Sequence, residues 1–210
     1  MVDAGGEHHR LEIAQPGLAN VYNALAAATA ASHLGVSPMT IARGLHTARA
    51  PFGRGETIAV SGKSLHLLLV KNPVGASVTL DLIAPAPDAR LHLWLALGDG
   101  EADGRDVSWI WDADYERLAG RMVSTTCSGP RAAKLAVRLK YAGWKGELDV
   151  DRDLGRSLRT ALERTEDQLF ALPTYTQLLG LRPVLGDLGA EVTDWGTSAR
   201  RAVISPTEFR

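Results

Sequence analysis

The sequence predicts an α/β protein in which a helical hairpin precedes a Rossmann-like domain with a mostly parallel, six-stranded sheet. Three observations lead to this prediction. From Thr57 onward, short apolar runs alternate with helical stretches, which is typical of a sheet covered by helices on both faces. The alanine-rich segment 18–33 has no interior helix breaker, which favours a helix ahead of the sheet. A length of 210 residues with 45% apolar content suits one large domain with an appendage.

The two N-terminal helices are predicted from their boundaries. Pro16-Gly17 forms a turn before the first helix. Ser37 is a good N-cap and Pro38 suits the first helical position, so a second helix should run to about Leu45. The segment 48–55 contains one proline and two glycines and is interpreted as a linker.

The predicted sheet domain occupies about residues 55–185. Its runs, in order, are TIAVS (57–61), LHLLLV (65–70), ASVTLDLIA (76–84), LHLWLAL (91–97), RMVSTT (121–126), PRAAKLAVRLKYAG (130–143), ELDV (147–150), a helix from about 153 to 165, QLFAL (168–172) and a helix that begins near Thr174. The last 25 residues contain several glycines and show no strong period, so a loosely packed tail is expected.

Charge and cysteine content exclude several classes of function. The chain has 23 basic and 24 acidic residues and a net charge of -1, which does not favour a nucleic acid or anionic membrane as partner. Cys127 is the only cysteine, so an internal disulfide and a cysteine-rich zinc site are excluded. The sequence shows no signal peptide and no apolar run long enough to span a membrane, and a cytoplasmic location is expected.

The segment 98–114, GDGEADGRDVSWIWDAD, is the densest group of chemically active residues. Five aspartates, one glutamate and two tryptophans follow a strand-like run within these seventeen residues. Loops at the carboxyl ends of strands in α/β sheets collect ligands and catalytic groups, which favours a functional site here. The alternative is a solvated connection in which aspartates cap turns and Trp109 and Trp111 anchor the loop in the core.

Several motif resemblances carry less weight. The triplet 62–64 ends like a P-loop, but Thr57 stands where a glycine is required and a strand follows, so a hairpin turn fits better. The GxGxxxG at 98–104 is interleaved with carboxylates that would repel a pyrophosphate. The same residues begin like a calcium loop, but Ile110 replaces the required glutamate, and no metal site is predicted. Cys127 precedes a predicted helix, where a reactive thiol and a buried apolar residue are both possible.

Six blocks of sequence, in the same order, resemble the MurT family of Mur-type ligase subunits. They are PGLANVYNALAA (16–27), APFGRGE (50–56), LLLVKNPVGA (67–76), ADGRDVSWIWDADYE (102–116), PRAAKLAVRLKYAG (130–143) and LPTYTQLL (172–179). The resemblance implies that residues 1–50 are a helical remnant of the Mur ligase central domain and that 51–185 are the Rossmann-like C-terminal Mur ligase domain. The tail 186–210 has no counterpart.

The resemblance also implies an activity. A MurT subunit pairs with a GatD-type glutamine amidotransferase in a heterodimer, and together they amidate the D-glutamate α-carboxylate of lipid II, using ATP and Mg²⁺. In such a reaction an acyl phosphate is displaced by ammonia that must arrive unprotonated and shielded from water. The aspartate of the family's GRD triplet is an active-site residue and corresponds to Asp106 here. We expect Asp106 to orient a histidine of a Cys-His pair in the partner, or to help position ammonia.

Three further residues match nucleotide-proximal positions of Mur-type ligases. Asn23 matches an asparagine that lies beside the adenine, and Lys71 and Asn72 match a hinge-proximal block where a lysine could neutralise phosphate charge. For Asn72 a structural turn with Pro73 is the alternative.

Departures from the family limit these expectations. The sequence has no GTNGKT-type P-loop and no four-cysteine ribbon, and Gly98 and Gly100 replace asparagines that are usual in the family. We therefore expect the isolated chain to be inactive and to bind no cofactor tightly. A non-catalytic module that only docks a GatD-type partner is the alternative function.

Overall fold

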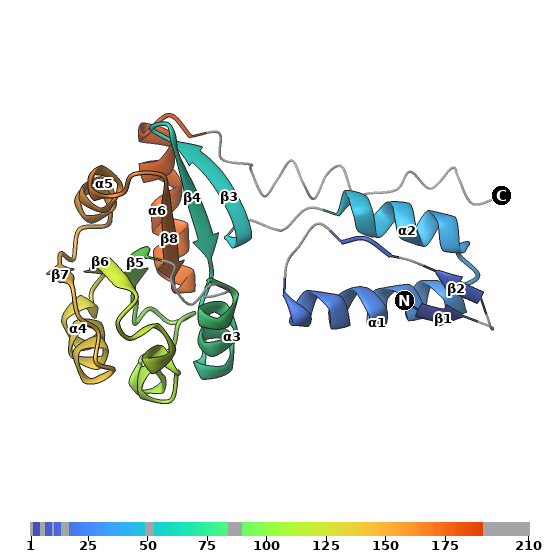
Figure 1. Cartoon of the computed structure of the whole chain (residues 1–210), viewed down its shortest axis with the longest axis horizontal. Coiled ribbons are helices and arrows are strands. Elements are labelled where there is room, and N and C mark those ends of the chain that lie inside the picture. The colour runs from blue at the N-terminus through green and yellow to red at the C-terminus, as the bar shows by residue number, and fades with distance from the viewer. Residues whose placement is uncertain are drawn as a thin grey trace. The chain divides into compact units, whose positions relative to one another are not determined.

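The computed structural model describes residues 2–4, 7–9, 11–13, 17–48, 53–83 and 90–190 (Figure 1). By its internal contacts the chain forms two compact units, Met1–Pro51 and Phe52–Arg210. Most of the tail expected at 186–210 lies outside the described residues. No helix in the described ranges combines the length and the apolar character needed to cross a bilayer.

The first unit contains the two expected helices and a short hairpin that was not predicted. Helix α1 spans Leu18–His33 and α2 spans Pro38–Thr47, while β1 (Val2–Ala4) pairs antiparallel with β2 (Glu7–His9). The Oγ of Ser37 accepts a hydrogen bond from the Thr40 N–H at 3.3 Å, which confirms the predicted N-cap. Ala28 is the only buried side chain described on α1.

The second unit contains the sheet and the helices that cover it. Its elements are β3 (Arg54–Val60), β4 (Lys63–Leu68), α3 (Pro73–Ile83), β5 (Leu91–Ala96), the 3₁₀ helices η1 (Ser108–Trp111) and η2 (Tyr115–Leu118), β6 (Met122–Ser128), α4 (Ala132–Tyr141), β7 (Glu147–Val150), α5 (Leu154–Arg164), β8 (Gln168–Pro173) and α6 (Tyr175–Asp187). Strand β3 begins inside the segment that was expected to be a linker.

The sheet has six strands in the order β3-β4-β8-β5-β6-β7, which confirms the predicted fold class. Only the β3–β4 pair is antiparallel, and the other four pairs are parallel. The β3–β4 turn places Ser61 and Gly62 at φ 51° and 77°, the positive values of a tight type I′ hairpin. The P-loop-like triplet is therefore part of a hairpin turn, as its neighbours predicted.

Alternate residues of the central strands build two cores on opposite faces of the sheet. On one face Leu93 and Leu95 pack with α3, α4 and both 3₁₀ helices. On the other face Trp94 and Ala96 pack with α5 and α6. The carboxyl ends of the parallel strands meet at one edge, and the acidic loop leaves β5 at that edge (Figure 1).

Candidate functional site at the acidic loop

Asp103 fastens the acidic loop to the start of α6. Its carboxylate accepts hydrogen bonds from the Thr174 Oγ at 2.9 Å, from the Thr176 N–H at 3.0 Å and from the Thr176 hydroxyl. Thr174 is the N-cap residue of α6, so the carboxylate also meets the positive end of the helix dipole. The Gly98 N–H donates to the Thr174 Oγ at 2.9 Å and closes the base of the loop.

Gly98 leaves the space that the Asp103 carboxylate occupies. A Cβ atom at Gly98 would overlap Asp103 Oδ2 and would lie 2.5 Å from Thr176 Oγ and 2.7 Å from Gln177 Nε2. A side chain at position 98 would therefore have to displace the Asp103 carboxylate or its neighbours.

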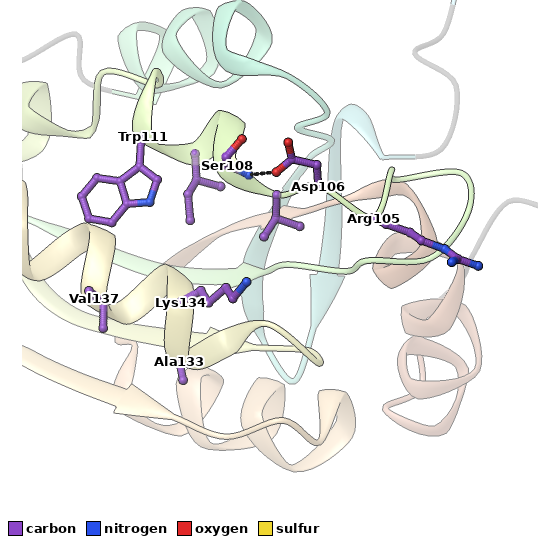
Figure 2. Close-up of a pocket in the computed structure, with 9 residues that line it drawn as sticks. Arg105, Asp106, Ser108, Trp111, Ala133, Lys134 and Val137 are labelled. Atoms are coloured by element: carbon purple, nitrogen blue, oxygen red, sulfur yellow. Dashed lines mark hydrogen bonds between the residues drawn. The ribbon is translucent and has the colours of Figure 1, made fainter.

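Asp106 stands in a tight turn at the surface. Its Oδ1 accepts a hydrogen bond from the Ser108 N–H at 2.8 Å, and its side chain is exposed (Figure 2). The pKa of Asp106 is lowered by the bonds from Ser108 and, to a smaller extent, by the positive charge of Lys134. Asp106 is therefore an ionised, oriented carboxylate at neutral pH.

The turn borders a hollow of about 450 Å³ between η1 and α4. Its lining combines charged, hydroxyl and apolar groups from these two elements and from the turn before η1, and comprises Arg105, Asp106, Val107, Ser108, Ile110, Trp111, Ala133, Lys134 and Val137. In Figure 2 the Lys134 side chain extends from α4 toward the hollow, whereas the Arg105 side chain points away from the other labelled residues.

Arg138 of α4 anchors the C-terminal part of the acidic loop. Its guanidinium is almost fully buried and donates to the carbonyls of Ile110 at 3.0 Å and Ala113 at 2.8 Å, and it forms a two-bond pair with Glu116. It also lies 5.5 Å from the ring centre of Trp111, within the range of a cation–π contact. Sequence reasoning missed Arg138, although an arginine at the spacing of the apolar residues 135, 139 and 142 is a signal of a buried charge.

The two tryptophans of the loop have different environments. Trp109 packs against the core, as predicted for an anchor. Trp111 is 51% exposed, so its prediction as a core anchor is wrong. Ile110 fills the inward position of η1 instead, and the Trp111 ring rests against Tyr141 of α4 with centroids 5.8 Å apart.

The remaining predicted site residues are not among those that line this hollow. Lys71 and Asn72 are exposed between β4 and α3 at the same sheet edge as the loop, and Asn72 Oδ1 accepts the Gly75 N–H at 2.7 Å. That bond supports the turn alternative for Asn72, because its amide oxygen is already engaged. Asn23 is exposed on α1 in the other unit.

The other chemical candidates of the sequence serve the structure. Lys63 Nζ donates to the Leu162 carbonyl at 2.5 Å, so this lysine ties the β3–β4 hairpin to α5. Burial raises the pKa of the Cys127 thiol to about 12, so the reactive alternative is excluded for the native chain. Within the described ranges, no three acidic, histidine or cysteine side chains converge as a metal site would require.

Comparison with known proteins identifies related sequences. The family model described as MurT ligase C-terminal matches residues 69–178. The lipid II isoglutaminyl synthase (glutamine-hydrolyzing) subunit MurT of Streptococcus pneumoniae is 36% identical over 182 residues, which cover 86% of this chain and 40% of that protein. The subunit of the same name from Staphylococcus aureus is 34% identical over 160 residues, or 76% of this chain and 36% of that protein. The chain thus spans less than half the length of these curated relatives.

Solved structures share the fold at lower sequence identity. The folylpolyglutamate synthase of Mycobacterium tuberculosis complexed with ADP superposes with a TM-score of 0.63 at 17% identity, covering 83% of this chain and 41% of that one. The UDP-N-acetylmuramate-alanine ligase of Thermotoga maritima has a TM-score of 0.62 at 16% identity, covering 87% of this chain and 40% of the ligase. These similarities establish a Mur ligase-like fold.

Proposed function

The chain belongs to the MurT ligase C-terminal family, and from this premise we propose that it is part of a lipid II isoglutaminyl synthase. In the complete enzyme, the D-glutamate α-carboxylate of lipid II would be amidated with ATP and with ammonia released from glutamine by a GatD-type subunit. The names of two curated relatives, each a glutamine-hydrolyzing synthase subunit, support this proposal.

The single observation that carries the proposal is the presentation of Asp106. Its carboxylate is ionised, oriented by the Ser108 N–H and exposed. A carboxylate that acted within this chain alone would be expected in an enclosed site with partner groups around it. An exposed carboxylate in a fixed turn instead suits a site that a second subunit completes, where it would orient a histidine or hold ammonia.

We expect nucleotide binding to need the complete enzyme rather than the described residues alone. The only P-loop-like triplet, 62–64, belongs to a hairpin turn, and its Lys63 donates a hydrogen bond to a backbone carbonyl. The Asn72 side chain accepts a hydrogen bond from the Gly75 N–H at the start of α3. ATP and Mg²⁺ therefore belong to the proposal for the complete enzyme, where Asn23 and Lys71 remain candidates for contact with the nucleotide. We expect no ATP hydrolysis and no amidation by the isolated chain.

A second candidate function is a module that only docks the GatD-type subunit. The structural hydrogen bonds made by Lys63 and by the Asn72 side chain favour this alternative. It shares the partner with the first proposal but assigns no chemistry to Asp106.

Glutaminase assays on mixtures of the chain and its purified GatD-type subunit distinguish these functions. We expect the wild-type chain to change glutamine turnover, Asp106→Asn to bind equally without that change, and Asp112→Asn, an exposed carboxylate in the same loop, to act like wild type. Binding with equal effects of all three chains would support the docking module. If no chain bound the subunit or altered its turnover, both functions would be refuted.

A further inference from the structure

The acidic loop supplies the cap of α6 that the helix does not provide for itself. Thr174 is the N-cap residue of α6, but its side chain makes no capping hydrogen bond within the helix. Its hydroxyl instead accepts the Gly98 N–H and donates to the Asp103 carboxylate, both at 2.9 Å. Asp103 in turn accepts the Thr176 N–H at 3.0 Å, a donor that an N-cap side chain usually satisfies. The stability of α6 alone does not require this exchange, which fastens the loop to the helix.

The groups that hold Asp103 belong to the frame of the domain. Thr174 is 2% exposed, and its N–H donates at 2.9 Å to the carbonyl of Ala96, the last residue of the central strand β5. Thr176 packs so closely on the loop that a Cβ atom at Gly100 would lie 2.8 Å from its Cγ2. Asp103 is therefore fixed to the carboxyl ends of β5 and β8 as well as to α6.

Asp106 follows Asp103 by three residues and depends on it for its place. The connecting segment 104–106 is exposed. Three residue steps span at most about 11 Å, so the position of Asp103 limits where Asp106 can lie. On the other side of the segment, Val107 is buried in the core. Fixed residues on both sides thus set the position of the Asp106 backbone, and the Ser108 N–H sets the direction of its carboxylate.

We propose that Asp103 is a positioning residue for Asp106, an inference that rests on the proposed function. Asp103 would touch neither glutamine nor the histidine of the second subunit. It would hold the turn that carries Asp106 in the place where that subunit completes the site. A displacement of about 1 Å can lower the rate of an enzymatic reaction by about a hundredfold, so such an anchor has a direct effect on turnover.

Two other roles of Asp103 lead to different expectations. A residue that only stabilised the fold would change the unfolding free energy and leave the activity of the folded complex intact. A carboxylate that took part in the chemistry would need its charge, whereas a positioning residue needs an acceptor for the Thr176 N–H. Asp103→Asn keeps that acceptor and removes the charge, so it separates the last two roles.

The proposal is tested by glutamine turnover in complexes of the 210-residue chain with its purified GatD-type subunit. We expect Asp103→Ala to retain at most about a tenth of the change in kcat that the wild-type chain produces, with KM nearly unchanged. Asp103→Asn should restore most of the change. Thr176→Val, which removes one hydroxyl donor to Asp103, should cause a smaller loss. Asp112→Ala, which removes an exposed carboxylate of the same loop, is the matched control and should act like wild type.

The motion of the turn is measured separately in the isolated chain. Backbone order parameters from NMR relaxation at residues 104–106 should fall in Asp103→Ala and stay near the wild-type values in Asp103→Asn. A residue that only capped α6 would leave these order parameters unchanged. Thermal unfolding and the affinity for the subunit identify any variant that has lost its fold or its partner.

Several results would overturn the positioning role. They are wild-type turnover or unchanged order parameters in Asp103→Ala, an Asp103→Asn variant as inactive as Asp103→Ala, and a loss of turnover explained by lost affinity. If Asp103→Ala does not fold, Thr176→Val decides, because it must lower both turnover and the order parameters at 104–106. Unchanged turnover in Asp106→Asn would instead refute the proposed function itself.

Discussion

Replacement of Arg138 by methionine tests whether a single buried cation supports the acidic loop. The variant keeps an unbranched apolar stem but removes the donors to the Ile110 and Ala113 carbonyls. A buried acceptor that loses its partner costs about 1 to 3 kcal/mol. The pair with Glu116 adds less than about 1 kcal/mol, since the Glu116 side chain is 53% exposed. We therefore expect a loss of about 3 kcal/mol in the free energy of unfolding.

Chemical and thermal unfolding followed by circular dichroism measure this loss. For a domain of this size, about 3 kcal/mol corresponds to a fall in Tm of about 6 to 12 °C. Lys140→Met on the exposed side of the same helix is the control and should change the unfolding free energy by less than about 0.5 kcal/mol. A loss below about 1 kcal/mol in Arg138→Met, or one equal to that of the control, would refute the support that we assign to Arg138.

The Arg138 pair also has a defined pH dependence. Hydrogen bonds from Arg138 lower the pKa of Glu116, so the folded chain holds the ionised form more tightly than the unfolded chain does. This stabilisation is complete above the unfolded pKa of about 4.3 and is lost as the pH falls through the lower folded value. The stability difference between wild type and Arg138→Met should consequently shrink below about pH 4.

Three other predictions concern the fold around the site. Gly98→Ala sets a methyl group against Asp103 and should lower the unfolding free energy by about 1 to 3 kcal/mol. Gly186→Ala is the control and should not destabilise the chain, because there is open space around Gly186. Equal effects of the two substitutions in denaturant titrations would contradict the close packing at Gly98. Cys127 should react with a thiol reagent only as the chain unfolds, because burial raises its pKa to about 12, and rapid labelling of the native chain would count against this. Hydrogen bonds from Arg156 hold the pKa of Asp151 at about 2. The stability difference between wild type and Arg156→Met should therefore be present at neutral pH and vanish between about pH 4 and pH 2. A constant difference across that pH range would contradict the pairing.

Local features of the sequence account for the elements that were predicted well. The caps Ser37 and Asp153 each accept a backbone N–H three residues on, and the helices begin directly after them. The turn at Ser61 and Gly62 follows from the spacing of two neighbouring strands, which are joined by only these two residues. In each case the signal and the structure that it directs lie within a few residues of each other, so propensity and spacing were enough.

The order of the strands and the anchoring of the loop depend on contacts far apart in the chain. Strand β8 inserts between β4 and β5, although it follows β7 in sequence, and no local pattern specifies that position. Asp103 is held by Thr174 and Thr176, more than seventy residues away. The sequence shows that these groups can bond, but only the fold decides which of the five aspartates of the loop meets them.

The two anchors leave Asp106 exposed between them, in a turn that orients its side chain. Asp103 ties the start of the loop to α6, and Arg138 ties the carbonyls of Ile110 and Ala113 to α4. In the short stretch between these anchors, the hydrogen bond from the Ser108 N–H to the Asp106 carboxylate sets the direction of that side chain. Polar contacts at both ends of this stretch thus hold an ionised, exposed carboxylate in a fixed direction. An ionised carboxylate that is exposed and oriented in this way fits the role proposed for Asp106 in a site that another subunit completes.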